Sequence, residues 1–276
     1  MSEAAHFADR LVAAVERKGA SLCVGLDPDP ALMPEGVGVA DFCRGIVEAV
    51  AGVAVAVKPQ SAFFEAQGAH GWTALADVCA YAREAGLLVI ADAKRGDVPS
   101  TARAYAAAFA PLADAVTVNP YLGHDSLEPF FARDGLGVFV LVKTSNPSSV
   151  DLQDLALADG RPLWQHVAGL VDRWGRDLVG ANGLSSVGAV VGATFPQEVA
   201  EARELLPRSV LLLPGVGAQG ARAEDLAAAF SVGPAGAIVT ASRSVIYADR
   251  GAGWQEAAAA AAERLAGELR AAAVAG

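Results

Sequence analysis

The sequence has no long apolar run, no paired cysteines and no cluster of basic residues, and each shortage argues against a class of protein. No apolar stretch approaches the roughly 20 residues that a bilayer-spanning helix needs. The three cysteines are odd in number and lack CxxC spacing, so we expect reduced thiols in a cytoplasmic protein. The net charge of −10 and the lack of a basic run argue against nucleic acid as a partner.

Lysine is scarce, with four lysines beside seventeen arginines. Arginine serves where a general positive charge is enough, so we expect the remaining lysines where a compact ammonium with an adjustable pKa is needed. Three of them, Lys58, Lys94 and Lys143, stand at the ends of apolar runs that are typical of strands. The lysines therefore point to chemistry at strand ends.

Apolar runs typical of buried strands alternate with helical patterns along the chain. The expected strands cover 21–26, 53–57, 87–91, 115–118, 137–142, 187–191, 210–213 and 237–240. The expected helices cover 1–19, 39–50, 72–84, 101–109, 126–133, 164–178, 196–206, 224–230 and the residues from 254 onward. This alternation predicts a (β/α)₈ TIM barrel, a single domain over residues 1–276 with an N-terminal helix. A doubly wound open sheet is the alternative, but no GxGxxG motif follows the first strand.

The stretch 87–101, LLVIADAKRGDVPST, carries three charges directly after a buried strand. Asp92 and Lys94 are two residues apart and should share one face of the strand. The turn at Gly96 should return Asp97 toward them or toward a neighbouring subunit. Because carboxylates keep a nearby lysine protonated, we expect Lys94 to be a held proton donor and a local positive charge. A structural ion pair at a strand–helix turn is the alternative interpretation.

Polar and charged side chains collect where the expected strands end, and (β/α)₈ barrels place their active sites at that edge. They are Asp27, Lys58, Asp92, Lys94, Asn119, Lys143, Ser145 and Arg243. The strand starts carry mostly small or apolar residues, which favours an active site over scattered surface charge. Lys143 and Ser145 are two apart and could both face the site, but a solvated loop lysine explains Lys143 equally well. We leave Lys143, Asn119 and Glu65 out of the chemistry, because a turn and a helix start explain the other two.

A glycine-rich loop, PGVGAQG over 214–220, follows the seventh expected strand. Glycines let backbone amides approach an anion, and barrels often hold a phosphate after strands seven and eight. The expected phosphate-binding residues are Gly215, Gly217, Gln219, Ser242 and Arg243. The guanidinium of Arg243 can clamp a phosphate with two hydrogen bonds. The pattern predicts a phosphorylated small molecule as the substrate.

One connection, 147–162, is polar and long for a compact domain. Such a segment is usually a lid, an insertion or a binding loop. We assign no role to any of its residues.

Several of these motifs together resemble the orotidine 5′-phosphate decarboxylase family. They are KPQ from Lys58, DAKRGDV from Asp92, TSNP from Thr144 and PGVGAQG from Pro214, and they follow one another along the chain in the same order as in the family. The chain looks like the bacterial subgroup with the DAKRGD form and a longer segment after strand five, although Val98 stands where Ile is usual. The resemblance implies a lyase that removes CO₂ from orotidine 5′-monophosphate to give uridine 5′-monophosphate. This is the last step of pyrimidine biosynthesis, and the family uses neither metal nor cofactor.

The resemblance also implies roles for the residues at the strand ends. Lys94 would protonate the C6 carbanion, and Asp92 would lie beside the substrate carboxylate. Lys58 and Asp27 would bind the ribose hydroxyls, with Lys58 also joining the network of Asp and Lys charges. Ser145 would hydrogen-bond the pyrimidine ring.

The resemblance further implies a homodimer. Asp97 and Thr101 would reach across the interface into the partner's site. Gln219 and Arg243 would hold the phosphate of the substrate.

Three other functions fit parts of the pattern. A Mg²⁺-dependent decarboxylase of a keto-sugar phosphate on a related barrel also uses Asp-x-Lys-x-x-Asp, but KPQ and TSNP argue against it. A Schiff-base aldolase needs a lysine with a depressed pKa, whereas Lys94 is flanked by acids. A non-catalytic phosphate-binding barrel would have lost an acid or a lysine from the strand-three motif, and none is missing.

Overall fold

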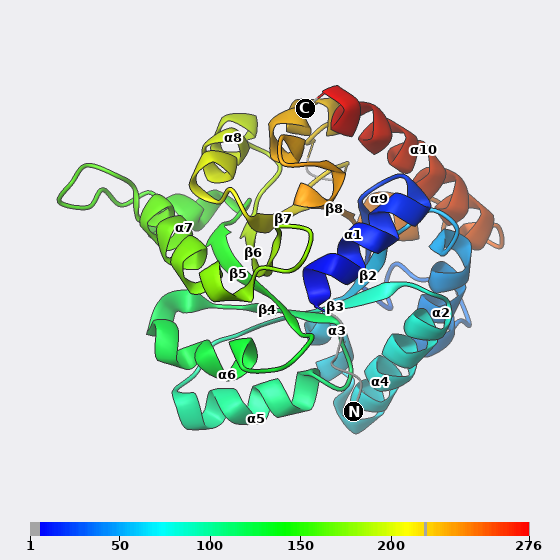
Figure 1. The fold of residues 1–276 in the computed structure, drawn as a ribbon. Helices are drawn as coiled ribbons and strands as arrows, with labels where there is room; N and C mark the ends of the chain where they lie inside the picture. The colour runs from blue at the N-terminus through cyan, green and yellow to red at the C-terminus, as the bar shows by residue number, and fades with distance from the viewer. Residues whose placement is uncertain (1–5, 218–219, 276) are drawn as a thin grey trace.

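Parallel strands pair in chain order and close into a barrel, with β8 returning to pair with β1 (Figure 1). The computed structural model describes residues 6–217 and 220–275. The strands are β1 (Leu22–Leu26), β2 (Ala56–Pro59), β3 (Leu88–Arg95), β4 (Ala115–Val118), β5 (Gly137–Lys143), β6 (Ser185–Val191), β7 (Ser209–Pro214) and β8 (Ala237–Ala241). The predicted (β/α)₈ fold is confirmed.

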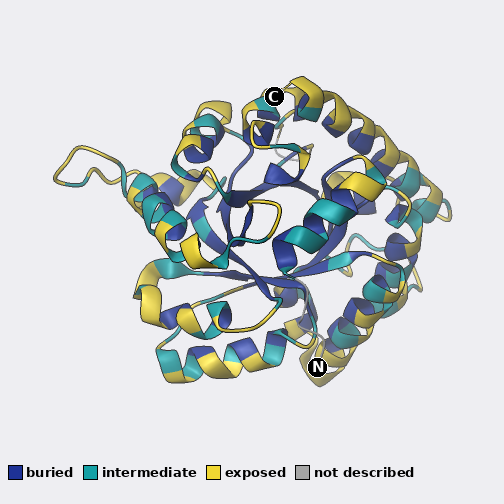
Figure 2. Ribbon diagram, in the orientation of Figure 1, coloured by how far each residue is buried: buried dark blue, intermediate teal, exposed yellow. Residues whose placement is uncertain are grey.

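Helices surround this barrel and turn their buried sides toward it (Figure 2). The α-helices are α1 (Phe7–Lys18), α2 (Val39–Val50), α3 (Ser61–Glu65), α4 (Gly68–Glu84), α5 (Pro99–Phe109), α6 (Glu128–Phe131), α7 (Leu163–Trp174), α8 (Pro196–Leu205), α9 (Arg243–Ile246) and α10 (Trp254–Ala275). The 3₁₀ turns are η1 (Pro120–Leu122), η2 (His124–Ser126), η3 (Pro147–Asp151), η4 (Arg176–Leu178), η5 (Ala223–Phe230) and η6 (Pro234–Gly236).

The core has two apolar layers, because successive strand residues point to opposite faces of the sheet. Val140 packs between the sheet and the helices, whereas its neighbour Phe139 packs inside the barrel. The predicted N-terminal helix α1 covers the N-terminal end of the barrel, where the ring of Phe7 meets that of Phe139 edge-on, with centroids 5.8 Å apart. That end is closed by apolar packing, so the opposite end is left for a functional site.

Several elements differ from the sequence prediction: the short helices α3 and α9 were not expected, and the bounds of others differ, as the following three show. The second strand begins at Ala56 rather than 53, because the amides of Val53 and Ala54 both bond back to the carbonyl of Val50 and continue the turn after α2. The helix expected over 126–133 shrinks to α6, since Pro129 has no N–H with which to join α6 to the preceding turn η2. The helix expected over 224–230 is the 3₁₀ segment η5.

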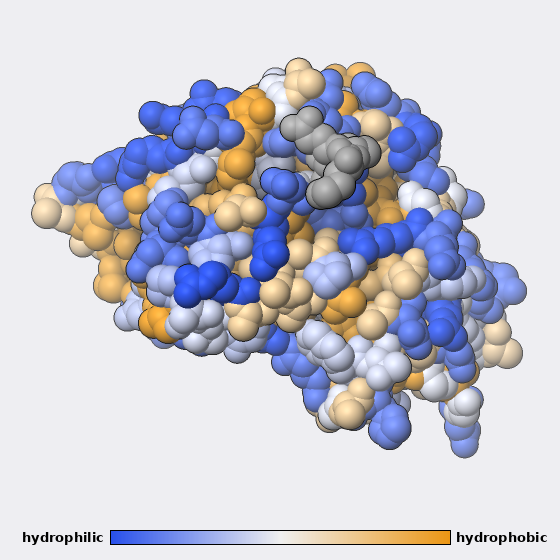
Figure 3. All heavy atoms as spheres, turned by 60° about the horizontal axis from the view of Figure 1, so that its bottom comes forward, coloured by the Kyte–Doolittle hydropathy of each residue, from blue (hydrophilic) through white to orange (hydrophobic). Residues whose placement is uncertain are grey.

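The thiols are unpaired, as predicted: Cys23, Cys43 and Cys79 are buried and free. Burial raises the pKa of Cys23 and of Cys79 to about 12, so these thiols remain protonated. In the described ranges, no helix combines the length and the apolar character needed to cross a membrane. On the face shown in Figure 3, hydrophilic and hydrophobic patches lie side by side.

Candidate active site

Asp92, in β3, is the centre of a buried cluster of charges. Lys58, from β2, ion-pairs with Asp92 Oδ2, and Lys94 Nζ lies 2.5 Å from Asp92 Oδ1. The side chains of Lys58 and Asp92 are 8% and 7% exposed, whereas that of Lys94 is 42% exposed. The predicted pairing of Asp92 with Lys94 is confirmed, and Lys94 is the ammonium of the cluster that a ligand can reach.

Two neutral side chains complete the contacts of this carboxylate. The hydroxyl of Thr117, in β4, donates to Asp92 Oδ1 at 3.0 Å and accepts from the backbone N–H of Lys94 at 2.9 Å. Gln60 Nε2 donates to Asp92 Oδ2 at 3.2 Å. Each carboxylate oxygen therefore receives one ammonium and one neutral donor. Sequence reasoning gave neither residue a role, although Gln60 belongs to the KPQ motif and Thr117 is the polar residue of an otherwise apolar strand.

The cluster fixes the charge of its buried members. Burial alone would raise the pKa of Asp92, but the ammonium groups of Lys58 and Lys94 outweigh it and hold that pKa far below the ordinary value. Burial likewise opposes the charge on Lys58, yet the carboxylates of Asp92 and Asp27 raise its pKa. Asp92 is therefore a permanent anion near neutral pH and does not serve as a general acid or base.

The backbone of Lys94 is strained. With φ of 47°, it is the one non-glycine residue in the described ranges with a positive φ. The β3–β4 register shifts between Ala91 and Arg95, so the end of β3 bulges where Lys94 lies. Such conformations persist where surrounding contacts determine them, and here Thr117 holds the Lys94 amide. The bulge thus sets the direction of the lysine.

A cavity of about 470 Å³ opens at this cluster, and its size is typical of small-molecule sites. Lys58, Asp92 and Lys94 line it together with Ser145, from the loop after β5. Ser145 packs against Gly192, where an added Cβ would lie only 3.0 Å from the backbone nitrogen of Ser145, so the missing side chain permits this approach. The structure therefore brings these four predicted residues into one site.

Asp27 and Ser242 meet where β1 and β8 end. The hydroxyl of Ser242 donates to Asp27 Oδ2 at 2.5 Å, and Gly25 permits this because a Cβ there would lie 2.7 Å from Ser242 Cβ. Asp27 Oδ1 is buried and has no hydrogen-bond partner among the described residues, so it can accept a hydrogen bond from a ligand. The hydroxyl of Ser242 thus holds Asp27, although the sequence suggested a place in the phosphate loop.

Asp97 and Thr101 do not reach Lys94 within the subunit. The carboxylate of Asp97 accepts from the backbone N–H of Val98 at 2.7 Å, and within the part of the chain that the structure describes no ion pair joins it to Lys94. Thr101 lies in the first turn of α5. The predicted return of Asp97 toward Asp92 and Lys94 within the subunit is therefore not seen among the described residues, and the predicted role of both residues across a dimer interface stays a prediction.

The predicted phosphate loop is only partly described. Gly215 and Gly217 have φ of 114° and 82°, which suits glycine, and Arg243 begins α9 directly after β8. Gln219 lies outside the described residues.

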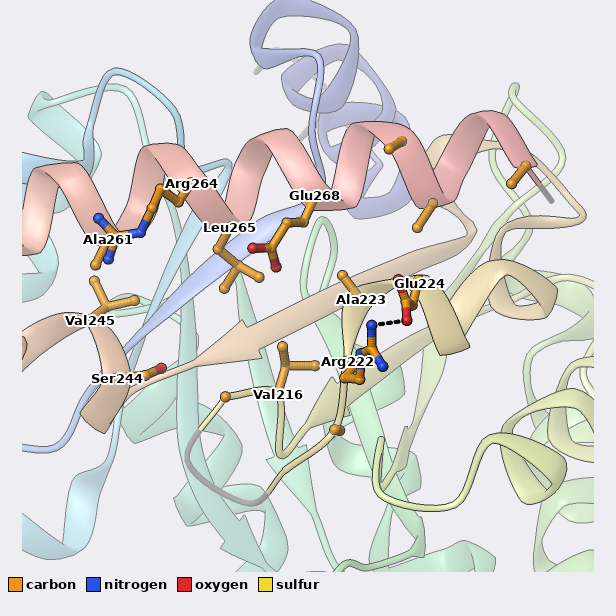
Figure 4. A pocket seen from close by; sticks show the side chains of 15 residues that line it. Val216, Arg222, Ala223, Glu224, Ser244, Val245, Ala261, Arg264, Leu265 and Glu268 are labelled. Atoms are coloured by element: carbon orange, nitrogen blue, oxygen red, sulfur yellow. Dashed lines mark ion pairs between the residues drawn. The ribbon is translucent and has the colours of Figure 1, made fainter.

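A second cavity, of about 660 Å³, lies between this loop and α10 (Figure 4). Val216, Gly217, Ser244, Arg264 and Glu268 are among its lining residues, but Lys58, Asp92 and Lys94 are not. It is the larger of the two cavities, yet no residue of the charged cluster lines it. The smaller cavity is therefore the candidate active site.

Lys143 is neither solvated nor in the cavity. Its side chain is 2% exposed, and its ammonium ion-pairs with Asp154 and Glu198. The idea that Lys143 faces the site together with Ser145 is wrong, because the β5–β6 register shifts between Leu141 and Lys143.

Known proteins carry the same fold and much of the same sequence. The model of the orotidine 5′-phosphate decarboxylase / HUMPS family matches residues 20–260. The chain is 47% identical to orotidine 5′-phosphate decarboxylase from Roseiflexus castenholzii, covering 97% of this chain and 98% of that protein. It is 45% identical to the enzyme of that name from Rhodopirellula baltica, covering 88% and 89%. The structure of Leishmania donovani OMP decarboxylase superimposes with a TM-score of 0.81 at 36% identity, covering 98% of this chain and all of that one (100%).

Proposed function

The chain belongs to the orotidine 5′-phosphate decarboxylase family, and we propose that its Lys58–Asp92–Lys94 cluster carries out the reaction. The enzyme is a carboxy-lyase that converts orotidine 5′-monophosphate to uridine 5′-monophosphate in pyrimidine biosynthesis. The observation that supports the role of the cluster is the exposed ammonium of Lys94, held 2.5 Å from a buried anion at the mouth of a cavity.

The chemistry that we propose is a decarboxylation followed by proton transfer. The bond between C6 and the carboxylate carbon breaks, its electron pair stays on C6, and CO₂ leaves. Lys94 Nζ then gives a proton to C6, forming the C6–H bond of the product, and recovers a proton from solvent. Because no conjugated group takes up the electron pair, a fixed ammonium in a site with little water stabilises it far better than water does.

Asp92 supports this step as a fixed charge. Its carboxylate would lie beside the carboxylate of the substrate, and its contacts with Thr117 and Gln60 keep it in place. Binding of the remote phosphate would offset the cost of placing two like charges together. Lys58 neutralises Asp92 from the buried side, which leaves Lys94 as the group that can move toward C6.

The remaining site residues would bind the rest of the nucleotide. Asp27 Oδ1, buried and without a partner in the described chain, suits a ribose hydroxyl. Ser145 would contact the pyrimidine ring, since it lines the cavity beside Lys94. Gly215, Gly217 and Arg243 would hold the phosphate, and we propose the same for Gln219.

We further propose a homodimer in which Asp97 and Thr101 complete the partner's site. Beside Asp97 the surface carries exposed apolar side chains: Val98 is 51% exposed and Tyr121 is 77% exposed. The loops that hold them are adjacent, because the amide of Asn119 donates to the carbonyl of Arg95 at 2.7 Å. Burial of such residues between two subunits would stabilise the dimer at about 25 cal/mol per Å² of apolar surface.

Some features of the cluster also bear on the alternatives. A Mg²⁺-dependent mechanism would use Asp92 as a ligand, but an ammonium group already occupies each of its oxygens. A Schiff-base mechanism is disfavoured because Lys94 is paired with an anion. We also propose that the chain belongs to the bacterial subgroup of the family and forms a single domain, which the closure of β8 on β1 supports. We further propose a cytoplasmic location, which the free thiols support.

The function is tested by mixing the purified protein with orotidine 5′-monophosphate and following ultraviolet absorbance, with and without EDTA. We expect the substrate absorbance to disappear at the same rate in both. No change with a folded protein would contradict the activity, and loss of the rate in EDTA would favour the metal-dependent alternative.

A further inference from the structure

Lys143 points away from the cavity because β5 is irregular at its end. Leu141 pairs with Val190, and both pack inside the barrel. The register then shifts, and Lys143 pairs with Val191, which packs between the sheet and the helices. Strict alternation from Leu141 would place Lys143 in the cavity, but the shift turns it outward into the helix layer.

In that layer, Lys143 connects two elements. Its Nζ lies 2.5 Å from Asp154 Oδ1, in the segment 147–162, and 3.8 Å from Glu198 Oε1, in α8. The lysine side chain is 2% exposed, whereas that of Asp154 is 35% exposed, so the segment supplies the counter-charge that this buried ammonium needs. The segment is therefore tied to the barrel at Asp154, although much of it is exposed and the loop before α7 projects beyond the helices (Figure 1).

Gln153, the residue before Asp154, lies at the active site. It lines the cavity with Lys94 and Ser145. Its Oε1 accepts from the backbone N–H of Thr144 at 2.8 Å, and its Nε2 donates to the Thr144 hydroxyl at 2.8 Å. An amide nitrogen has two hydrogens, so one donor of Gln153 is left for a ligand.

We propose that Lys143 is a positioning residue for the pyrimidine subsite: its ion pair with Asp154 holds Gln153 in the cavity, where the amide donates to a carbonyl oxygen of the substrate ring. This inference rests on the proposed function. Gln153 contacts the ring and contributes to substrate affinity, whereas Lys143 acts through Gln153 and takes no part in the chemistry. The segment 147–162 is then part of the binding site.

The test compares steady-state constants for orotidine 5′-monophosphate in K143M, D154N and Q153L of the full chain. Loss of one hydrogen bond to the ring should raise KM by roughly three- to tenfold in each variant, with kcat nearly unchanged. The dissociation constant of uridine 5′-monophosphate should rise by a similar factor. The matched control is D159N, because Asp159 lies in the same segment but pairs with Arg161, on the exposed surface.

A merely structural role predicts different results. It would reduce the yield of folded enzyme or kcat, without a selective rise in KM. The double variant K143M/Q153L should have the same KM as Q153L alone, because Lys143 acts through Gln153. If K143M does not fold, D154N and Q153L still decide the matter.

Two results would overturn the inference while leaving the proposed function intact. One is that the wild-type enzyme consumes orotidine 5′-monophosphate while D154N and Q153L both have KM values within twofold of the wild-type value. The other is that KM of K143M/Q153L rises by the product of the fold-increases measured for K143M and for Q153L, because the two residues would then act independently. Failure of the wild type to consume orotidine 5′-monophosphate would overturn the proposed function itself.

Discussion

Lys58 and Lys94 bind opposite oxygens of the same carboxylate, that of Asp92. They differ in burial, since 8% of the Lys58 side chain is exposed but 42% of the Lys94 side chain. Lys58 therefore sets the charge and position of Asp92, whereas Lys94 is open to the cavity. Replacing the two lysines should have different consequences, for stability in one case and for chemistry in the other.

Lys58→Met should lower the free energy of unfolding by up to about 3–5 kcal/mol, because it removes a counter-charge from buried Asp92. Denaturant unfolding at pH 7 measures the loss. Lys18→Met is the matched control, since among the described residues Lys18 Nζ donates to the backbone carbonyl of Ala51 and does not contact the cluster. Its cost should be about 1 kcal/mol. Equal costs for the two variants would contradict the role of Lys58.

The stability difference between wild type and Lys58→Met should also depend on pH. The lowered pKa of Asp92 stabilises the wild type fully above the unfolded pKa of about 4, and this contribution declines as the pH falls toward the native pKa. In the variant, burial of Asp92 with one counter-charge fewer raises that pKa. We expect the difference in unfolding free energy to narrow between pH 7 and pH 3. A difference that stays constant over this range would show that Asp92 is not the titrating group.

Thr117→Val should reduce kcat/KM by roughly 5- to 150-fold, the equivalent of 1–3 kcal/mol for a lost buried hydrogen bond. The substitution keeps the shape of the side chain but frees both Asp92 Oδ1 and the Lys94 amide. Steady-state kinetics measures the effect. Thr73→Val, on the exposed surface of α4, is the control and should behave as wild type. Wild-type kinetics for both variants would exclude a positioning role for Thr117.

Mixed dimers should reveal whether Asp97 serves the partner's site. Lys94→Ala and Asp97→Ala are each expected to be inactive, but a dimer with one subunit of each contains one intact site. After exchange of equal amounts, about a quarter of wild-type activity should return. Mixing Lys94→Ala with Asp92→Ala is the control, because both residues belong to the same subunit's site and no activity should return. Equal recovery in both mixtures, or none in either, would contradict the shared site.

Much of this arrangement could be predicted from the sequence. The barrel was predicted from apolar runs such as 87–91 and 115–118, which lie in strands of the structure. Such runs can be recognised because a strand that is buried on both faces tolerates few polar residues. Lys58, Asp92 and Lys94 came from the rule that a barrel active site lies where the strands end. That rule uses position along the chain and does not require the exact register of the sheet.

The parts that were missed depend on register and on long-range contacts. The bulges in β3 and β5 break the alternation of side chains. Counting by two still predicted the pairing of Asp92 with Lys94, but it could not decide between a solvated Lys143 and one that faces the site, and neither is found. Gln153 gave no signal because it lies in a polar segment and is placed at the cavity by contacts with residues such as Thr144, nine positions away in the sequence. Local pattern carries no information on such contacts.

The most direct test of the account is the rate at which Lys94→Ala consumes orotidine 5′-monophosphate, compared with wild type at saturating substrate. Loss of both the proton donor and the fixed positive charge should lower the rate by at least about 10³-fold, while the unfolding transition stays intact. A folded variant that keeps a tenth of the wild-type rate would contradict the assignment of Lys94 as the proton donor.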